Sequence, residues 1–108
     1  MKETIETTKW GKIHYIEEKN YRFSLYYYND DPIDIYLSNV FVDEKLRGNG
    51  LGNSLLKVAY DRAKEINPKS TLCLKCLKNS WVCNWYKRHG YTHMSEDDDN
   101  NYVWLKKS

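Results

Sequence analysis

The sequence contains little proline, glycine or cysteine and has no long apolar run. Two prolines and 5 glycines occur in 108 residues, and no stretch is rich enough in these residues or in serine to form a linker. The N-terminal segment 1–8 has no apolar run that could serve as a signal peptide or a membrane span. We therefore expect a single domain over residues 1–108, located in the cytoplasm and without a membrane partner.

The cysteines and the net charge argue against a disulfide framework, a metal site and a dedicated nucleic-acid binder. Cys73, Cys76 and Cys83 are an odd number in a chain without a secretory signal, so we interpret all three as reduced thiols. The spacing of Cys73 and Cys76 occurs in metal and redox sites, but residues three apart on a strand point to opposite faces, and we predict no metal site. Seventeen basic and 15 acidic side chains give a net charge of +2, far from the footprint of a dedicated nucleic-acid binder.

Aromatic residues are abundant, since 10 Tyr and 4 Trp can supply much of the area of a core. Segments 12–17 and 21–28 interleave β-branched or aromatic residues with polar ones around a short turn, which predicts a hairpin. A turn signal at 29–32 precedes a third strand, 33–42, whose alternation breaks down at Val40-Phe41-Val42. Three consecutive antiparallel strands are therefore expected to form a meander.

The periodicity changes after this meander. Apolar residues recur three or four apart from Leu51 to Ile66, which predicts a helix with one apolar face. The short apolar segment 71–77 predicts a strand that lies parallel to the third one. A right-handed crossover through the helix would connect these two strands.

The remaining elements complete the predicted fold. A second helix should begin at Asn79 or Ser80 and end at Gly90, and a closing hairpin should follow in residues 91–106. The predicted class is α+β, a three-layer arrangement around a mixed, mostly antiparallel sheet. The predicted order is β-β-β-α-β-α-β-β, with room for one more strand before Trp10.

The third strand and the first helix are joined by a turn with three glycines in five residues, Gly48, Gly50 and Gly52. Glycines at a helix start let backbone N–H groups approach an anion, which the helix dipole also favours. A P-loop would need Gly-Lys-Ser/Thr here, and the dinucleotide fingerprint would need a glycine where the chain has Asn53. The remaining pattern, Arg/Gln-x-x-Gly-x-Gly/Ala, is matched by Arg47, Gly50 and Gly52.

With Val40-Phe41-Val42 before the turn and Leu55-Leu56 after it, this pattern resembles the acetyl-CoA-binding motif of the GNAT family of N-acetyltransferases. A second segment resembles the family's later motif: Asn79, then Trp85 to Gly90, then Tyr91 in place of Phe. The resemblance implies a parallel strand pair beside the cofactor. It also implies transfer of an acetyl group from acetyl-CoA to a primary amine, on a small molecule or on a protein lysine or N-terminus, by direct attack in a ternary complex.

The resemblance further implies roles for particular residues. The backbone N–H of Val42 would stabilise the oxyanion, and Tyr86 would protonate the departing thiolate unless it is only a core aromatic. Phe41 and Val42 would hold the pantetheine arm as an added strand, and Asn79 would hydrogen-bond it or cap the helix. The implied cofactor-binding residues are Phe41, Val42, Arg47, Gly48, Asn49, Gly50, Leu51, Gly52, Asn53 and Asn79.

The acceptor side is less determined. Typical members of the family place two helices between their first two strands to build the acceptor site, and this chain has no room for them. The acceptor groove should then be shallow, formed by the meander and the C-terminal hairpin, or completed by a second subunit of a homodimer. We expect the aromatic stretch Tyr26-Tyr27-Tyr28 to be exposed and to form an acceptor wall or an interface. The general base stays open among Asp34, Ser38 and Asn39.

Two alternatives belong to other functional classes. A non-catalytic acyl-CoA-binding module would keep the glycine turn and lack turnover. A basic-aromatic interaction domain for single-stranded nucleic acid would use Tyr and Lys side chains on the sheet face.

Overall fold

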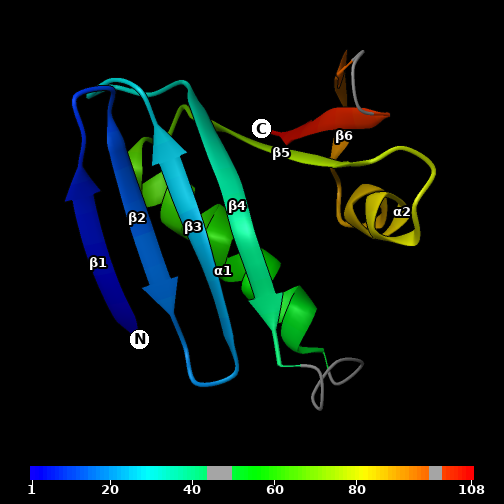
Figure 1. Ribbon diagram of the computed structural model, residues 1–108, viewed down its shortest axis with the longest axis horizontal. Coiled ribbons are helices and arrows are strands. Elements are labelled where there is room, and N and C mark those ends of the chain that lie inside the picture. The colour runs from blue at the N-terminus through cyan, green and yellow to red at the C-terminus, as the bar shows by residue number, and fades with distance from the viewer. Residues whose placement is uncertain (44–49, 98–100) are drawn as a thin grey trace.

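The computed structural model describes residues 1–43, 50–97 and 101–108, which form seven strands and two helices (Figure 1). The elements in chain order are β1 (Lys2–Thr7), β2 (Lys12–Glu17), β3 (Tyr21–Tyr27), β4 (Asp34–Val42), α1 (Leu51–Ile66), β5 (Thr71–Leu77), α2 (Trp81–Arg88), β6 (Thr92–Asp97) and β7 (Tyr102–Lys107). The predicted α+β class and element order are confirmed, and the additional strand before Trp10 is β1. The predicted three-layer arrangement is not found in the described part of the chain, because both helices pack on one face of the sheet. In the described part of the chain, no helix combines the length and hydropathy that a membrane crossing requires.

The strands form one mixed sheet in the order β1-β2-β3-β4-β5-β7-β6. Neighbouring strands are antiparallel except β4 and β5, which are parallel and are connected through α1 as predicted. The last strand, β7, lies between β5 and β6, so the closing hairpin returns into the sheet. Helix α1 ends where Asn67 adopts an extended conformation and its N–H bonds to the Ala63 carbonyl at 3.0 Å.

Both helices cover the same face of the sheet. Side chains on that face alternate along the strands and are buried: Phe23, Leu25, Tyr27, Ile35, Leu37, Leu72, Leu74, Cys76, Val103 and Leu105. They form one apolar cluster with side chains of both helices. In Figure 1, α1 lies behind β2, β3 and β4, while α2 lies beside β5. Because side chains alternate between faces, the opposite face of the sheet is left without either helix.

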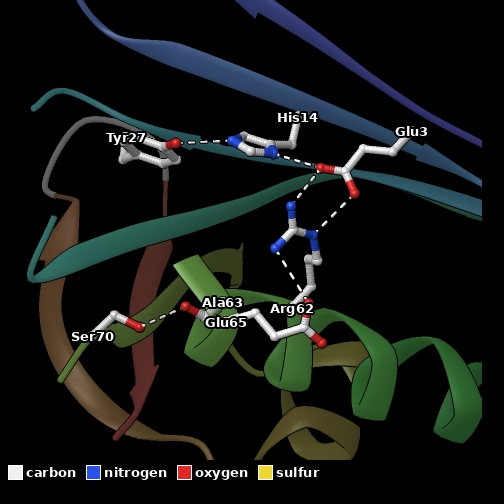
Figure 2. A network of polar contacts seen from close by, with 7 residues as sticks. All are labelled: Glu3, His14, Tyr27, Arg62, Ala63, Glu65 and Ser70. Carbon is white, nitrogen blue, oxygen red and sulfur yellow. Dashed lines mark hydrogen bonds and ion pairs between the residues drawn. The ribbon is translucent and has the colours of Figure 1, made fainter. Parts of the chain in front are cut away.

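A polar network fastens the edge strand β1 to the rest of the fold (Figure 2). Arg62 of α1 donates two hydrogen bonds to the Glu3 carboxylate, at 2.9 and 2.8 Å. His14 of β2, only 4% exposed, lies 2.7 Å from Glu3 through Nδ1 and 2.8 Å from the Tyr27 hydroxyl through Nε2. Tyr27 is therefore buried on the helix side, and its predicted place in an exposed aromatic stretch is wrong.

The interpretation of all three cysteines as reduced thiols is also wrong. Cys76 and Cys83 form a disulfide bridge, with their Cα atoms 5.5 Å apart. Cys76 lies on the helix-covered face of β5, and the first turn of α2 brings Cys83 directly onto it. Cys73 points to the opposite face as a free, buried thiol, and burial raises its pKa to about 11.

Candidate functional site

Strands β4 and β5 are paired only at their beginnings. Their register runs from Asp34 and Thr71 to Tyr36 and Cys73. β4 continues to Val42 and β5 to Leu77, but no ladder pairs join the two strands there, and Figure 1 shows them running apart. We call these diverging segments, residues 37–42 and 74–77, the fork. Parallel strands that separate in this way present backbone edges to which an extended ligand can bind as an added strand.

A β-bulge directs β4 away from β5. Arg22 pairs with Phe41 and Ser24 with Ser38, so β4 has one more residue than β3 between these pairs. Asn39, inside the bulge, has a left-handed φ of 53°, and its side-chain amide lies 3.5 Å from the Ser24 hydroxyl. The broken alternation in residues 40–42 is the sequence signal for this irregularity. The bulge explains why the strand pairing ends early and why the fork opens.

Helix α1 begins beside the open end of the fork. Gly50 is the N-cap residue, with a left-handed φ of 79° and no side-chain cap. A Cβ at this position would meet no atom of the described residues within 4 Å. The first turn contains no acidic side chain. Among the described residues, nothing caps this helix start, adds negative charge to its first turn or fills the space beside Gly50. Such a helix start is suited to bind an anion such as a pyrophosphate.

A glycine is needed at position 52 for a different reason, the packing of the two helices. A Cβ at Gly52 would lie 2.9 Å from the Trp85 ring of α2, closer than real Cβ contacts allow. The glycine therefore lets α2 pack against the first turn of α1. This close packing needs no ligand, so the three glycines of the turn do not all require the same explanation.

Helix α2 carries Tyr86 on its buried face. The Tyr86 side chain is 8% exposed, and its ring lies 5.1 Å from Trp85 and 5.8 Å from Tyr91. Burial raises the pKa of the Tyr86 phenol above its ordinary value. A phenol in this environment stays protonated at neutral pH and can donate a hydrogen bond or a proton.

The start of α2 decides between the two predicted capping residues. Ser80 is the N-cap, and its side chain accepts a hydrogen bond from the Cys83 N–H at 3.1 Å. Asn79 precedes the helix with a left-handed φ of 64°. Its side chain has no hydrogen-bond partner within residues 1–43, 50–97 and 101–108. The amide is thus available for another partner.

The other predicted cofactor-binding residues lie in different places. Phe41 is 42% exposed, and the Arg22 guanidinium lies 4.3 Å from the centre of its ring. Val42 ends β4 opposite Tyr21, and Leu51 is the first residue of α1. Arg47, Gly48 and Asn49 lie outside the described residues. Asn53 lines a hollow of about 290 Å³, whose other lining residues are Leu56, Lys57, Tyr60, Asp61, His89, Tyr91 and Lys107.

The sheet face without helices carries a second hollow, beside the bulge. This hollow of about 170 Å³ is lined by Tyr15, Ile16, Glu17, Arg22, Phe23, Ser24 and Asn39. Of the three candidates for the general base, Asn39 lines it, whereas Asp34 lies at the paired end of β4, 3.9 Å from the Cys73 sulfur. Sequence reasoning did not identify Glu17 or Ser24, because only the strand register brings them next to the bulge.

An aromatic array continues along this face from the meander to β7. Tyr26 and Tyr36 stack at 5.0 Å, Tyr28 packs against both, and Trp104 meets Tyr36 edge-on at 5.6 Å. Lys75 lies over the Trp104 ring at 5.6 Å. The array covers the strands where helices are absent, so these rings replace a helix layer as apolar cover.

Comparison with known proteins agrees with this geometry. Residues 10–93 match the acetyltransferase (GNAT) domain family. The fold is similar to that of Escherichia coli ElaA, with a TM-score of 0.70 at 16% identity, covering 91% of this chain and 68% of that one. It is similar to an acyl-CoA N-acyltransferase from Pseudomonas aeruginosa, with a TM-score of 0.67 at 18% identity, covering 91% and 68%.

A third similar structure is a GNAT family acetyltransferase from Elizabethkingia anophelis with acetyl-CoA bound. Its TM-score is 0.68 at 18% identity, and the match covers 92% of this chain and 76% of that one. Likeness at these identities concerns the fold, since one fold hosts many activities.

Proposed function

The chain belongs to the GNAT acetyltransferase family, and we propose that it transfers an acetyl group from acetyl-CoA to a primary amine. The observation that carries this proposal is the fork between β4 and β5, whose open end lies beside the uncapped start of α1. An elongated ligand with an anionic middle and an extended, amide-containing arm fits such a site. Acetyl-CoA has this construction, and when bound it supplies an activated acetyl group.

The donor would be held mainly by backbone. Gly50 and the turn before it, including Arg47, Gly48 and Asn49, would bind the pyrophosphate at the start of α1. Phe41 and Val42 would hydrogen-bond the pantetheine arm along β4, and the exposed amide of Asn79 would bind it from the other side of the fork. Gly52 and Leu51 would shape the first helical turn, with Asn53 at its border.

The reaction joins the amine nitrogen to the acetyl carbon and breaks the carbon–sulfur bond. The amine loses one proton, and the departing thiolate gains one. In our proposal, the backbone N–H of Val42 stabilises negative charge on the acetyl oxygen. Tyr86 donates to the sulfur, because burial keeps its phenol protonated at neutral pH.

The acceptor would approach from the sheet face without helices. The hollow beside the bulge is close to β4 and has a carboxylate, Glu17, and a guanidinium, Arg22, in its lining. A primary amine of a small molecule or a protein could place its nitrogen there. A second subunit lying on this face would be the other way to complete the acceptor side.

Ligand-induced stabilisation tests the donor site. Binding at about 100 times Kd should raise the melting temperature of the wild type by about 10 °C. Gly50→Asp should abolish most of this rise, because a carboxylate would lie where the pyrophosphate binds. Gly50→Asn is the matched control: it has the same size and tolerates the same left-handed backbone, but lacks the charge. Equal stabilisation of the Asp variant and the wild type would refute the assignment of the site.

Turnover distinguishes the enzyme from a non-catalytic acyl-CoA-binding module. Incubation with acetyl-CoA and a panel of amines, followed by mass spectrometry, should reveal an acetylated amine and free CoA in equal amounts. Binding of acetyl-CoA without an acetylated product from small amines or lysine peptides would favour the module. Binding of oligonucleotides alone would favour the nucleic-acid domain.

A further inference from the structure

The hollow beside the bulge contains two opposite charges that are not paired with each other. Glu17 of β2 and Arg22 of β3 are direct partners in the strand register, and both line this hollow. Opposite charges at such positions can form a stabilising cross-strand pair. In the described part of the chain, however, no carboxylate forms an ion pair with Arg22. Both charged groups can therefore contact a ligand in the hollow.

The Arg22 guanidinium lies over the ring of Phe41 instead, 4.3 Å from its centre. A cation over an aromatic face is attracted to it, and this contact leaves the N–H groups at the guanidinium edge free to donate. Arg22 is also the partner of Phe41 in the β3–β4 pairing. Phe41 directly precedes Val42, whose N–H we assign to the acetyl oxygen. A group bound by Arg22 would therefore lie next to the reacting thioester.

The hollow suits a small, polar acceptor. Its volume of about 170 Å³ equals that of about six water molecules in the liquid, and it is below the roughly 300–1,000 Å³ of pockets for drug-sized ligands. Its lining includes the buried Ser24 and the Asn39 amide, which lies 3.5 Å from the Ser24 hydroxyl. A neighbouring hollow of about 340 Å³ shares Glu17 and Arg22 with it and gives room for a side chain of the acceptor.

We propose that the acceptor is a small amine that also carries a carboxylate, as an amino acid does, and that Arg22 binds this carboxylate. The guanidinium fork matches a carboxylate with two parallel hydrogen bonds. Glu17 attracts the ammonium form in which the acceptor arrives, and its charge disfavours a doubly charged phosphate at the same place. Arg22 is thus a specificity-determining residue of the acceptor site.

This inference rests on the proposed function and names its substrate class. The amine nitrogen bonds to the acetyl carbon, and the carbon–sulfur bond breaks. The products are an N-acetyl amino acid and CoA. The proton that the amine loses balances the proton that the sulfur gains.

Paired acceptors test the proposal. The kcat/KM of the wild type is measured at saturating acetyl-CoA for L-amino acids and for the carboxamide of each. The wild type should prefer the acid of each pair. In Arg22→Met this preference should fall about 10- to 100-fold, through a higher KM for the acids at unchanged KM for the amides, because hydrogen bonds to a charged group are lost. Comparing preferences between the two proteins cancels the different basicity of the paired amines.

Two further variants separate the guanidinium from its charge. Arg22→Lys keeps the charge but loses the fork, so its preference should lie between those of the wild type and Arg22→Met. Lys12→Met is the matched control, since it removes one positive charge from the same hairpin but at the other end of β2, opposite Tyr27. This control should keep the preference of the wild type. Acetyl-CoA should raise the melting temperature of all variants as it does for the wild type, which shows that they are folded with an intact donor site.

Several results would overturn the proposal. Carboxamides that are as good as the acids for the wild type, or turnover confined to amines without a carboxylate, would show that no carboxylate is recognised. A preference that survives in Arg22→Met, or falls equally in Lys12→Met, would remove the role of Arg22. Faster turnover of phosphoethanolamine than of any amino acid would assign the hollow to a phosphate. A wild type that acetylates no amine at all would instead refute the proposed function.

Discussion

Replacing Glu3 by glutamine should destabilise the protein at neutral pH and leave it little changed in strong acid. Glu3 connects β1 to Arg62 of α1 through two hydrogen bonds and also contacts His14 (Figure 2). Hydrogen bonding to Arg62, with a smaller effect of His14, lowers the pKa of the Glu3 carboxyl from 4.5 to about 2. The carboxylate form is therefore stabilised in the folded protein.

The pKa values set the size and the pH range of this effect. The full difference between 4.5 and about 2 corresponds to about 3 kcal/mol in the free energy of unfolding. The Glu3 side chain is 21% exposed, and screening by solvent reduces the expected contribution to about 1–2 kcal/mol. Because the folded pKa is the lower one, this stability is present above pH 4.5 and is lost as the pH falls towards 2.

Urea unfolding of the wild type and Glu3→Gln at pH 7, 4, 3 and 2 measures the effect. The wild type should be more stable at pH 7, and the difference should shrink steadily below pH 4.5. Glu6→Gln is the matched control, since Glu6 lies exposed on the same strand. A constant difference between the wild type and Glu3→Gln at all pH values would refute the reasoning, as would an equal effect in the control.

Two further predictions concern α2. Alkylation of the unfolded protein without a reductant should label one cysteine, Cys73, and prior reduction should make all three reactive. Labelling of all three before reduction would contradict the bridge. Cys83→Ser should lower the free energy of unfolding by about 2 kcal/mol. Tyr86→Phe should lower kcat about a hundredfold at an unchanged acetyl-CoA affinity, because a proton donor acts on the reaction and not on binding. Stopped-flow or coupled thiol assays measure kcat. Wild-type turnover of the variant would show that Tyr86 is only a core aromatic.

Local patterns in the sequence were sufficient for the elements with strong periodicity. The predicted bounds of α1 and β5, Leu51–Ile66 and Thr71–Leu77, are those of the structure. An apolar residue every three or four positions marks the buried face of a helix whatever surrounds it. The parallel pairing of β4 and β5 followed from their connection through a helix, since parallel neighbours need a crossover connection and this is usually a helix.

Features that depend on contacts between distant segments could not be predicted from local sequence patterns. β1 is mostly exposed and is held by Glu3 and Arg62, so it has no apolar pattern. The disulfide depends on how α2 packs against β5, which brings Cys83 onto Cys76. The close approach of Trp85 to Gly52 likewise depends on packing between the two helices.

The sequence by itself determined the family, the order of the elements and the glycine turn, because these follow from neighbours in the chain. Only the tertiary structure decided where β4 leaves β5, which glycine packs against Trp85 and how Cys83 meets Cys76. These properties depend on strand register and helix packing. The register is set by the bulge at Asn39, and the packing is set by the fit of α2 onto α1 and β5.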